Sequence, residues 1–233
     1  MKKIVVLTTK TLHHNFFCQQ LLKKFFFQII YETRKVVPKY KIFHSYIKKR
    51  NKFEKKKFFG SKKIDYLFDY KVKNLNDKKS INLIKKLKPT HILCFGISKL
   101  EKNFIKSFSK IEISNLHGGD PEKYRGLDSL LWSIYFNDFS SLYTTLHILK
   151  HRLDTGPIIA KKKIKISKKI NLENLRYFNT INCIKLTEKY FYNILKSIKT
   201  YKKKQKKIGS YYSYLPSDKI NLCKKNLEYY KLN

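Results

Sequence analysis

The amino-acid sequence predicts an α/β fold with a mostly parallel central sheet, and three observations support this. Continuous apolar runs, KIVVLT at residues 3–8 and HILCF at residues 91–95, are typical of strands buried on both faces. Segments with helical spacing separate such runs, as in sheets whose parallel strands are joined by crossover helices. Five of the seven glycines lie between residues 96 and 156, and three of these directly follow predicted strands, where open α/β sheets place their binding crevices.

The first half of the chain alternates between strand and helix patterns. After the first strand, apolar residues at helical spacing predict an amphipathic helix over about residues 14–30. The lysine-rich stretch 48–63 is weakly patterned, and we expect a surface excursion there. Residues 76–87 predict a helix that Pro89 ends before the next strand.

The second half continues the alternation up to about residue 200. Its predicted elements are a short helix at 101–109, strands at 111–115, 144–149 and 158–166, a helix at 127–135 carrying Trp132, and a long helix at 172–198 broken near Asn179. We therefore expect one domain over residues 1–200. Residues 201–233 are too few and too irregular for a second domain, and we expect a short extension that packs on the first domain or on a partner in a homodimer.

The formal net charge of +37 would ordinarily indicate a nucleic-acid or anionic-membrane partner. However, only five of the 53 basic residues are arginine, whose planar guanidinium is preferred for phosphate and base recognition. The chain is rich in Lys, Asn, Ile, Phe and Tyr and contains a single Ala, a pattern expected from an AT-rich genome. We interpret the lysines as solvated surface charge and do not expect nucleic acid to be the partner.

The cysteines and the apolar segments indicate the compartment. Four widely separated cysteines without a C-x-x-C pair argue against a disulfide scaffold or a metal site, so we expect no metal and a reduced, cytoplasmic setting. Lysines interrupt every apolar segment before it reaches bilayer-spanning length, and the first apolar run lacks a cleavage pattern. We therefore expect neither membrane insertion nor secretion.

Polar groups suited to acyl transfer gather near the predicted strand ends. Asn115 and His117 alternate along an extended strand, so both side chains project to one side while Leu116 points to the core. A histidine can accept a proton and stabilise an oxyanion, and an asparagine amide can donate to the same oxygen. Asp154 begins an Asp-Thr-Gly turn and could orient the imidazole or relay protons. From spacing alone, a purely structural histidine explains the pattern equally well.

A longer stretch favours catalysis. NLHGGDPEKYRGLDSLLWSI followed by TTLHILKHRLDTGPII resembles the catalytic core of the folate-dependent formyltransferases, which shows Asn-x-His, a Pro and a Tyr-Arg-Gly turn, a Trp-bearing helix, a Thr-x-His strand and an Asp-x-Gly turn. The resemblance covers residues 90–160 most strongly. It implies a Rossmann-like formyltransferase domain in which Asn115, His117 and Asp154 are the catalytic residues.

The resemblance also implies a co-substrate, 10-formyltetrahydrofolate, and a place for it. The pterin would lie against the loop that holds Phe95, Gly96 and Ile97, and the turn at residues 150–153 would close the other side. That turn contributes Lys150, His151, Arg152 and Leu153, whose cations could attract the glutamate tail of the folate or be ordinary surface charge.

Departures from the family pattern bear on the acceptor. The turn at residues 8–14 lacks the Gly- and Ser-rich phosphate loop of the purine-synthesis branch, and the tail after Ile208 is too short for the barrel domain of the tRNA branch. Gly118 and Gly119 replace a bulkier pair and leave room on the acceptor side. The sequence therefore favours another small-molecule amine, and amino sugars linked to nucleotides are used by a related branch.

Three further residues are predicted acceptor contacts with open alternatives. His13, where the first strand meets its helix, could reach the acceptor or cap the helix. Arg125 could hold an anionic acceptor or brace neighbouring carbonyls, and the same two roles are possible for Tyr124. His147 is expected to support the site from within a strand. Two rival functions remain: hydrolysis of 10-formyltetrahydrofolate, and a noncatalytic, lysine-dependent nucleic-acid-binding protein on the same fold.

Overall fold

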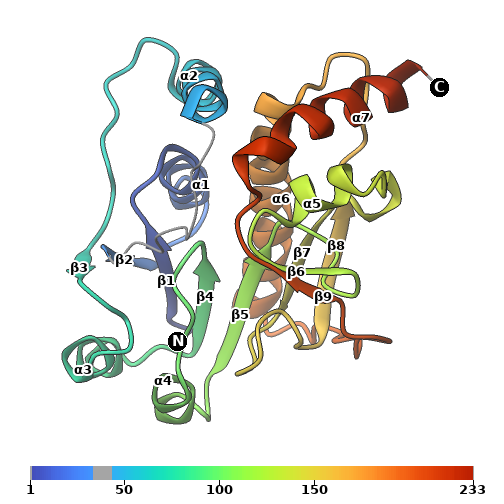
Figure 1. The fold of residues 1–233 in the computed structure, drawn as a ribbon. Helices are drawn as coiled ribbons and strands as arrows, with labels where there is room; N and C mark the ends of the chain where they lie inside the picture. The colour runs from blue at the N-terminus through green and yellow to red at the C-terminus, as the bar shows by residue number, and fades with distance from the viewer. Residues whose placement is uncertain (1, 34–43, 233) are drawn as a thin grey trace.

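A twisted sheet forms the centre of the molecule, with helices on both faces (Figure 1). The computed structural model describes residues 2–33 and 44–232. Within these residues, one seven-stranded sheet has the order β3-β2-β1-β4-β5-β7-β8. The strands, in that order, are β3 (Tyr70–Val72), β2 (Gln28–Glu32), β1 (Ile4–Thr9), β4 (His91–Phe95), β5 (Glu112–His117), β7 (Tyr143–Ile148) and β8 (Ile158–Lys163).

The sheet is parallel from β3 to β5 and antiparallel at β7 and β8. This confirms the expected mostly parallel α/β fold. The carboxyl ends of β1, β4 and β5 meet at one edge of the sheet, and β7 runs back alongside β5 so that Asn115 pairs with His147 and His117 with Thr145. Parallel neighbours and an antiparallel return thus bring residues from distant sequence positions to one edge.

Helices and a small second sheet complete the fold. The α-helices are α1 (Leu12–Leu22), α2 (His44–Phe59), α3 (Lys78–Lys86), α4 (Lys102–Ser107), α5 (Ser129–Tyr135), α6 (Leu175–Leu195) and α7 (Ile220–Leu232). Short 3₁₀ turns are η1 (Phe139–Ser141), η2 (Leu172–Asn174) and η3 (Ser217–Lys219), and β6 (Tyr124–Gly126) pairs in parallel with β9 (Ser210–Tyr212). In the described part of the chain, no helix is both long and apolar enough to cross a bilayer.

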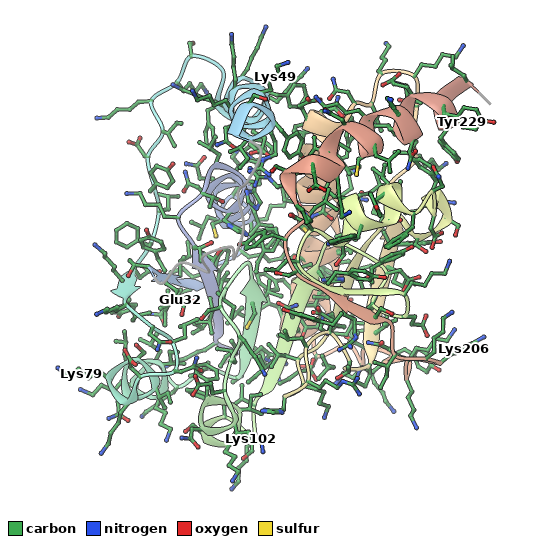
Figure 2. The ribbon with its side chains drawn as sticks, viewed as in Figure 1. Glu32, Lys49, Lys79, Lys102, Lys206 and Tyr229 are labelled. Carbon is green, nitrogen blue, oxygen red and sulfur yellow. The ribbon has the colours of Figure 1, made fainter. Side chains whose placement is uncertain are left out.

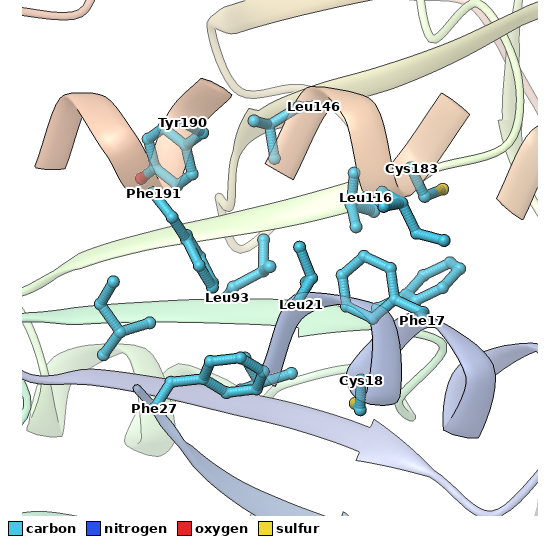
Figure 3. Packing of buried hydrophobic residues seen from close by; sticks show 14 of the residues in the cluster. Phe17, Cys18, Leu21, Phe27, Leu93, Leu116, Leu146, Cys183, Tyr190 and Phe191 are labelled. Atoms are coloured by element: carbon cyan, nitrogen blue, oxygen red, sulfur yellow. The ribbon is translucent and has the colours of Figure 1, made fainter. Parts of the chain in front are cut away.

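The central strands are apolar on both faces because both faces are covered. Ile4 and Val6 of β1 pack in a cluster with α1 and α6, whereas Val5 and Leu7 pack in a second cluster with α3 and α4. Figure 3 shows the first cluster, in which Phe17 and Leu21 of α1 lie toward α6 and Phe191 of α6 packs against Phe27, with ring centroids 5.6 Å apart. Burying side chains of this size contributes about 1.5–3 kcal/mol each.

Charged side chains cover the outside of this core. Lys49, Lys79, Lys102 and Lys206 lie on widely separated parts of the chain and extend outward from the ribbon (Figure 2). All four are exposed. Their spread over the surface agrees with the interpretation of the lysines as solvated charge.

The helix expected over residues 14–30 is wrong in its second half. α1 ends at Leu22, and Gln28–Glu32 forms β2, which pairs with β1. Phe26 is exposed although the helical stripe predicted it to be buried, while Ile29 and Ile30 are buried on opposite faces of the sheet. Pairing with a strand more than 20 residues away overrides the local helical spacing. The three-residue strand β3 was missed for the same reason.

The surface excursion expected at residues 48–63 is also wrong. Most of this stretch belongs to α2, which packs on α1 and η2. Phe58 stacks on Phe16 with ring centroids 4.3 Å apart, and Glu54 is fully buried in an ion pair with Arg176. The lysines lie on the exposed side of the helix, so their number hid the apolar side. Likewise, α6 continues through Asn179 without the expected break.

The segment after residue 200 packs on the helices and strands that precede it. α7 packs against α5, and Cys223 and Leu227 join Leu131 and Ile134 in a third apolar cluster. β9 pairs with β6 directly behind the predicted catalytic residues. The tail is thus connected to the site.

Candidate active site

Asn115 and His117 lie at the carboxyl end of β5, as the alternation predicted. Leu116 between them is buried in the α1–α6 cluster, and the His117 side chain is only 5% exposed. The Nε2 atom of His117 lies 2.9 Å from the Tyr124 carbonyl oxygen. Because a carbonyl can only accept, this contact places a proton on Nε2 and turns Nδ1 toward the turn that carries Asp154.

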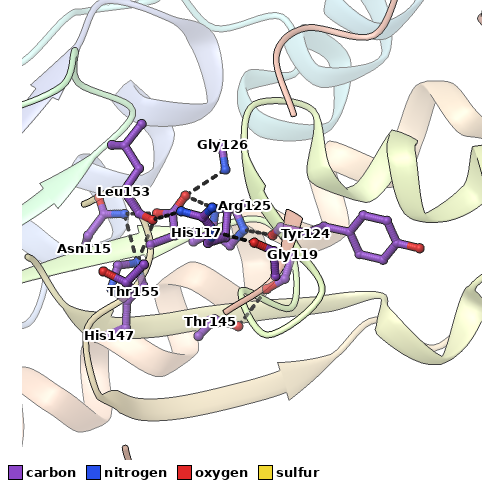
Figure 4. A network of polar contacts seen from close by, with 12 residues as sticks. Asn115, His117, Gly119, Tyr124, Arg125, Gly126, Thr145, His147, Leu153 and Thr155 are labelled. Carbon is purple, nitrogen blue, oxygen red and sulfur yellow. Dashed lines mark hydrogen bonds and ion pairs between the residues drawn. The ribbon is translucent and has the colours of Figure 1, made fainter. Parts of the chain in front are cut away.

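Asp154 reaches both residues from the turn between β7 and β8. Its Oδ2 lies 3.6 Å from Nδ1 of His117, and its Oδ1 accepts a hydrogen bond from the Asn115 amide at 3.4 Å (Figure 4). The Gly126 N–H donates to Oδ2 at 2.8 Å. Asp154 adopts a left-handed backbone conformation, φ 55°, which is uncommon for a residue with a side chain. Three residues separated by up to 39 positions therefore meet at one point.

His147 is the fourth member of this cluster. It is 1% exposed, and its Nδ1–H donates to the Ile148 carbonyl at 2.8 Å. Its Nε2 lies 3.3 Å from Oδ1 of Asp154 and 3.2 Å from the amide nitrogen of Asn115. The supporting position expected for His147 thus agrees with the geometry, since its ring fixes the orientation of both partners.

The surroundings of Asp154 favour its ionised form. Burial alone would raise the pKa of this carboxyl group, but the neighbouring His117, the hydrogen bond from His147 and the Gly126 N–H outweigh burial. The pKa therefore lies well below the ordinary value. An ionised carboxylate facing an imidazole can stabilise the imidazolium form and help to transfer a proton.

Gln205, which lies outside the recognised motifs, holds the Asp154 turn, and sequence reasoning missed it. Gln205 donates through Nε2 to the carbonyls of Asp154 and Gly156, both at 2.8 Å. Gly156 is required because a Cβ there would lie 1.8 Å from the Ile148 carbonyl oxygen. No local signal marks Gln205, which stands within a run of lysines.

The predicted co-substrate residues border one apolar cluster. Gly96 is exposed and has φ 71°, and Ile97 and Leu149 both pack on the α3–α4 side of the sheet. Lys150, His151 and Arg152 are exposed, and Leu153 is half-buried. The side chain of Phe95 is instead 5% exposed and packs against His14 and Phe17, so only its backbone borders the loop.

These residues fit a folate in chemical character. Gly96 has no side chain, and its backbone is exposed where a flat ring could approach it. Ile97 and Leu153 offer partly exposed apolar surface, and the cations of Lys150 and Arg152 suit a carboxylate tail. The loop is held from behind, since the Thr8 and Thr9 hydroxyls donate to the carbonyls of Phe95 and Gly96.

The predicted acceptor residues divide into two groups. Gly118 is partly exposed beside Asn179, whose amide would lie 3.1 Å from a Cβ at that position. Gly119 is buried, and a Cβ there would lie 2.7 Å from the Ser129 Cβ and 2.8 Å from Nε2 of His117, so only glycine fits this close approach to the ring. His13 is 7% exposed and stacks on His14, with Thr11 bonded to its Nδ1.

Tyr124 and Arg125 face inward, which favours the bracing alternative. The Arg125 guanidinium donates to the carbonyls of Gly209 at 2.6 Å and Leu153 at 3.0 Å, and this side chain is 5% exposed. The Tyr124 hydroxyl donates to Asp138, and the ring stacks with Phe136. Arg125 thus fastens the Asp154 turn to the tail, and Tyr124 anchors β6 to the segment that follows α5.

The fold and this cluster define a Rossmann-like α/β domain whose Asn-His-Asp site lies at the carboxyl end of a central strand. Residues 2–178 match the formyl transferase family, and because the match covers most of the chain, the protein belongs to that family.

Curated relatives match over a shorter region. The bifunctional polymyxin resistance protein ArnA of Wigglesworthia glossinidia brevipalpis is 35% identical over 103 residues, covering 44% of this chain and 16% of that protein. The methionyl-tRNA formyltransferase of Finegoldia magna is 34% identical over 103 residues, covering 44% of this chain and 33% of that protein. The matched region therefore spans a third or less of these relatives.

Solved structures match over nearly the whole chain. A sugar N-formyltransferase from a Shewanella species superimposes with a TM-score of 0.65 at 13% identity, covering 97% of this chain and 87% of the other. PseJ from Anoxybacillus kamchatkensis, in complex with UDP-4,6-dideoxy-4-formamido-L-AltNAc and tetrahydrofolate, superimposes with a TM-score of 0.55 at 18% identity, covering 94% and 88%. At these identities the likeness shows the shared fold.

Proposed function

We propose that this protein transfers a formyl group from 10-formyltetrahydrofolate to a primary amine. The observation that carries the proposal is the meeting of Asn115, His117 and Asp154 at separations of 3.4 and 3.6 Å in a member of the formyl transferase family. These are the groups that acyl transfer needs: a donor for the developing oxyanion, an imidazole, and an ionised carboxylate for proton transfer.

Each residue has a role that follows from its position. The neutral amine attacks the formyl carbon, and Asn115 and protonated His117 donate to the oxyanion that develops. Asp154, kept ionised by its neighbours, assists removal of the proton from the amine. The tetrahedral intermediate then collapses with cleavage of the bond between the formyl carbon and N10, and the proton taken from the amine passes to N10 of the departing tetrahydrofolate. In this structure the Nε2–H of His117 points at the Tyr124 carbonyl oxygen. The substrate oxygen would take the place of that carbonyl and accept the hydrogen bond from His117. His147 and Gln205 keep the carboxylate in place during the exchange.

The co-substrate would lie between the loop at Gly96 and Ile97 and the turn that ends at Leu153. The exposed glycine, the half-buried apolar side chains and the nearby cations support this position. The formyl group would then have to reach the end of β5, which lies next to β4 in the sheet.

We propose an amino sugar linked to a nucleotide as the acceptor. Solved neighbours of this fold are sugar N-formyltransferases, and PseJ was solved with a UDP-linked formamido sugar and tetrahydrofolate. Gly118, next to His117, is partly exposed and has no side chain, which supports an acceptor approaching the end of β5. A cytoplasmic location would give access to folate and nucleotide sugars.

The test is the replacement His117→Ala, assayed by mass spectrometry of candidate amines incubated with the protein and 10-formyltetrahydrofolate. We expect formylated product to fall by about 10²–10⁴-fold, the usual contribution of a positioned acid–base group, while the far-ultraviolet circular dichroism spectrum stays unchanged. His91→Gln is the matched control, because His91 begins β4 at the opposite end of the sheet. Undiminished turnover by His117→Ala would refute the assignment, and free formate without formylated amine would indicate hydrolysis.

A further inference from the structure

A buried carboxylate lies behind the proposed co-substrate loop and is used by none of the catalytic steps. Glu32 is the last residue of β2, and its side chain is 1% exposed. Figure 2 shows it in the interior beside β1 and β2. A carboxylate is expensive to bury, so its partners show what holds it there.

The partners of Glu32 come from two loops, and none of those found is a cation. Oε2 accepts from the Ser98 N–H at 2.9 Å, and Oε1 accepts from the Ser98 hydroxyl at 2.7 Å and from the Leu75 N–H at 3.1 Å. Within the described residues, no salt bridge to Glu32 is found. Both oxygens therefore serve as acceptors for neutral donors, and two of the three donors belong to Ser98.

Ser98 is the residue through which the loop after β4 turns inward. Gly96 is exposed and Ile97 is half-buried, whereas Ser98 and Leu100 are 8% and 3% exposed. The loop thus presents its first two residues outward while Ser98 is fixed below them. Thr9 holds the carbonyl of Gly96, so the outward residues are fixed on both sides.

We infer that Glu32 is a positioning residue for the folate co-substrate: by accepting both donors of Ser98, it fixes the backbone of Gly96 and Ile97 in the shape that binds the pterin. The inference rests on the proposed function. A charged acceptor forms shorter and stronger hydrogen bonds than a neutral one, which suits a loop that must be ordered before the ligand arrives. A glutamine of the same shape would turn its NH₂ group toward either the Ser98 N–H or the Leu75 N–H, and because neither N–H can accept, that bond would be lost.

The test uses calorimetry on the full chain to compare how tightly the Glu32→Gln and wild-type proteins bind 5-formyltetrahydrofolate. We expect the dissociation constant to rise about tenfold, as for loss of one hydrogen bond to a charged group. Hydrogen exchange should accelerate at the amides of residues 96–99 and stay unchanged at residues 115–117. The matched control is Glu112→Gln, which removes a carboxylate bonded to Tyr190 at the other end of the sheet and should leave folate affinity unchanged.

A double-mutant cycle separates positioning from general stability. Ser98→Ala should weaken folate binding by about two- to fivefold, and adding it to Glu32→Gln should cost less than the sum because both act through one contact. Ser98→Ala also serves if Glu32→Gln does not fold. A folded Glu32→Gln or Ser98→Ala protein that binds within twofold of wild type would overturn the inference. Failure of the wild-type protein itself to bind the folate would instead refute the proposed function.

Discussion

Asp154 is the residue on which the geometry of the site depends most. Its carboxylate contacts Asn115, His117 and His147, and its backbone is held by Gln205. Since its pKa is lowered, the stability that these contacts supply is present above the ordinary carboxyl pKa of about 4 and is lost as the pH falls through and below that value. At neutral pH the carboxylate is fully ionised, as its proposed role requires.

His14 should make the protein sensitive to mild acid. Burial and the nearby Arg176 lower the pKa of this imidazole from 6.5 to about 3. Between these values the unfolded chain binds a proton that the folded protein does not, so stability falls as the pH drops from 6.5, by up to about 1.4 kcal/mol per pH unit. We expect His14→Gln to flatten the pH dependence of the urea unfolding free energy between pH 4.5 and 6.5.

The control for this prediction is His151→Gln, because His151 is exposed. The pH dependence of the unfolding free energy of His151→Gln should match that of the wild-type protein. A His14→Gln protein with the wild-type slope would show that the buried imidazole is not the group responsible. The buried His13, whose pKa is also lowered by burial and by Arg176, should account for part of the slope that remains.

At the scale of elements, the tail and the Asp154 turn support each other. β9 pairs with β6, Gly209 accepts from Arg125, and Gln205 bridges the carbonyls on either side of the Asp154 turn. A Cβ at Gly209 would lie 2.5 Å from the backbone of Lys123, so the two segments are in close contact. A tail that looks irregular in sequence thus forms part of the support of the site.

Gln205→Ala should therefore reduce activity more than stability. Loss of two hydrogen bonds from a half-buried amide leaves the turn carbonyls unpaired and loosens Asp154, and we expect the turnover number to fall about tenfold. The melting temperature should change by only a few degrees. Lys204→Ala, at an exposed neighbouring position, is the control and should retain wild-type turnover. Equal turnover in both variants would show that the tail has no influence on the turn.

At the scale of the whole molecule, the charge is large and one-sided, with 53 basic against 16 acidic residues. The ion pairs found include Lys24–Glu188 and Lys224–Glu173, but the basic residues far outnumber the acidic residues that could pair with them. Mutual repulsion among them opposes the compact state. Assembly into a homodimer stays a prediction.

Salt should stabilise this protein. Raising the ionic strength from about 0.01 M to about 0.3 M shortens the Debye length from about 30 Å to below 10 Å and screens the repulsion. We expect the melting temperature, measured by differential scanning calorimetry, to rise by several degrees, equally in sodium and potassium chloride. A melting temperature that falls with added salt would mean that attractive ion pairs outweigh the repulsion.

Local pattern predicted the elements that carry their own signal. The runs at β1 and β4 are apolar because both faces of the sheet are covered, and the Asn-x-His alternation of β5 follows from strand geometry alone. The motifs from Asn115 to Asp154 identified the catalytic candidates. In contrast, β2 and α2 were misjudged, since a sheet neighbour decides the first and a buried side hidden among lysines decides the second.

The sequence by itself determined the fold class, the strand that carries the proposed catalytic pair and the family to which the chain belongs, because each depends on residues close together in the chain. Only the tertiary structure decided that Gln205 and Gly209 support the Asp154 turn, that Arg125 braces carbonyls, and that Glu32 holds Ser98. These contacts join residues 28 to 84 positions apart. Their hydrogen bonds depend on the packed arrangement of the sheet and leave no periodic pattern along the chain.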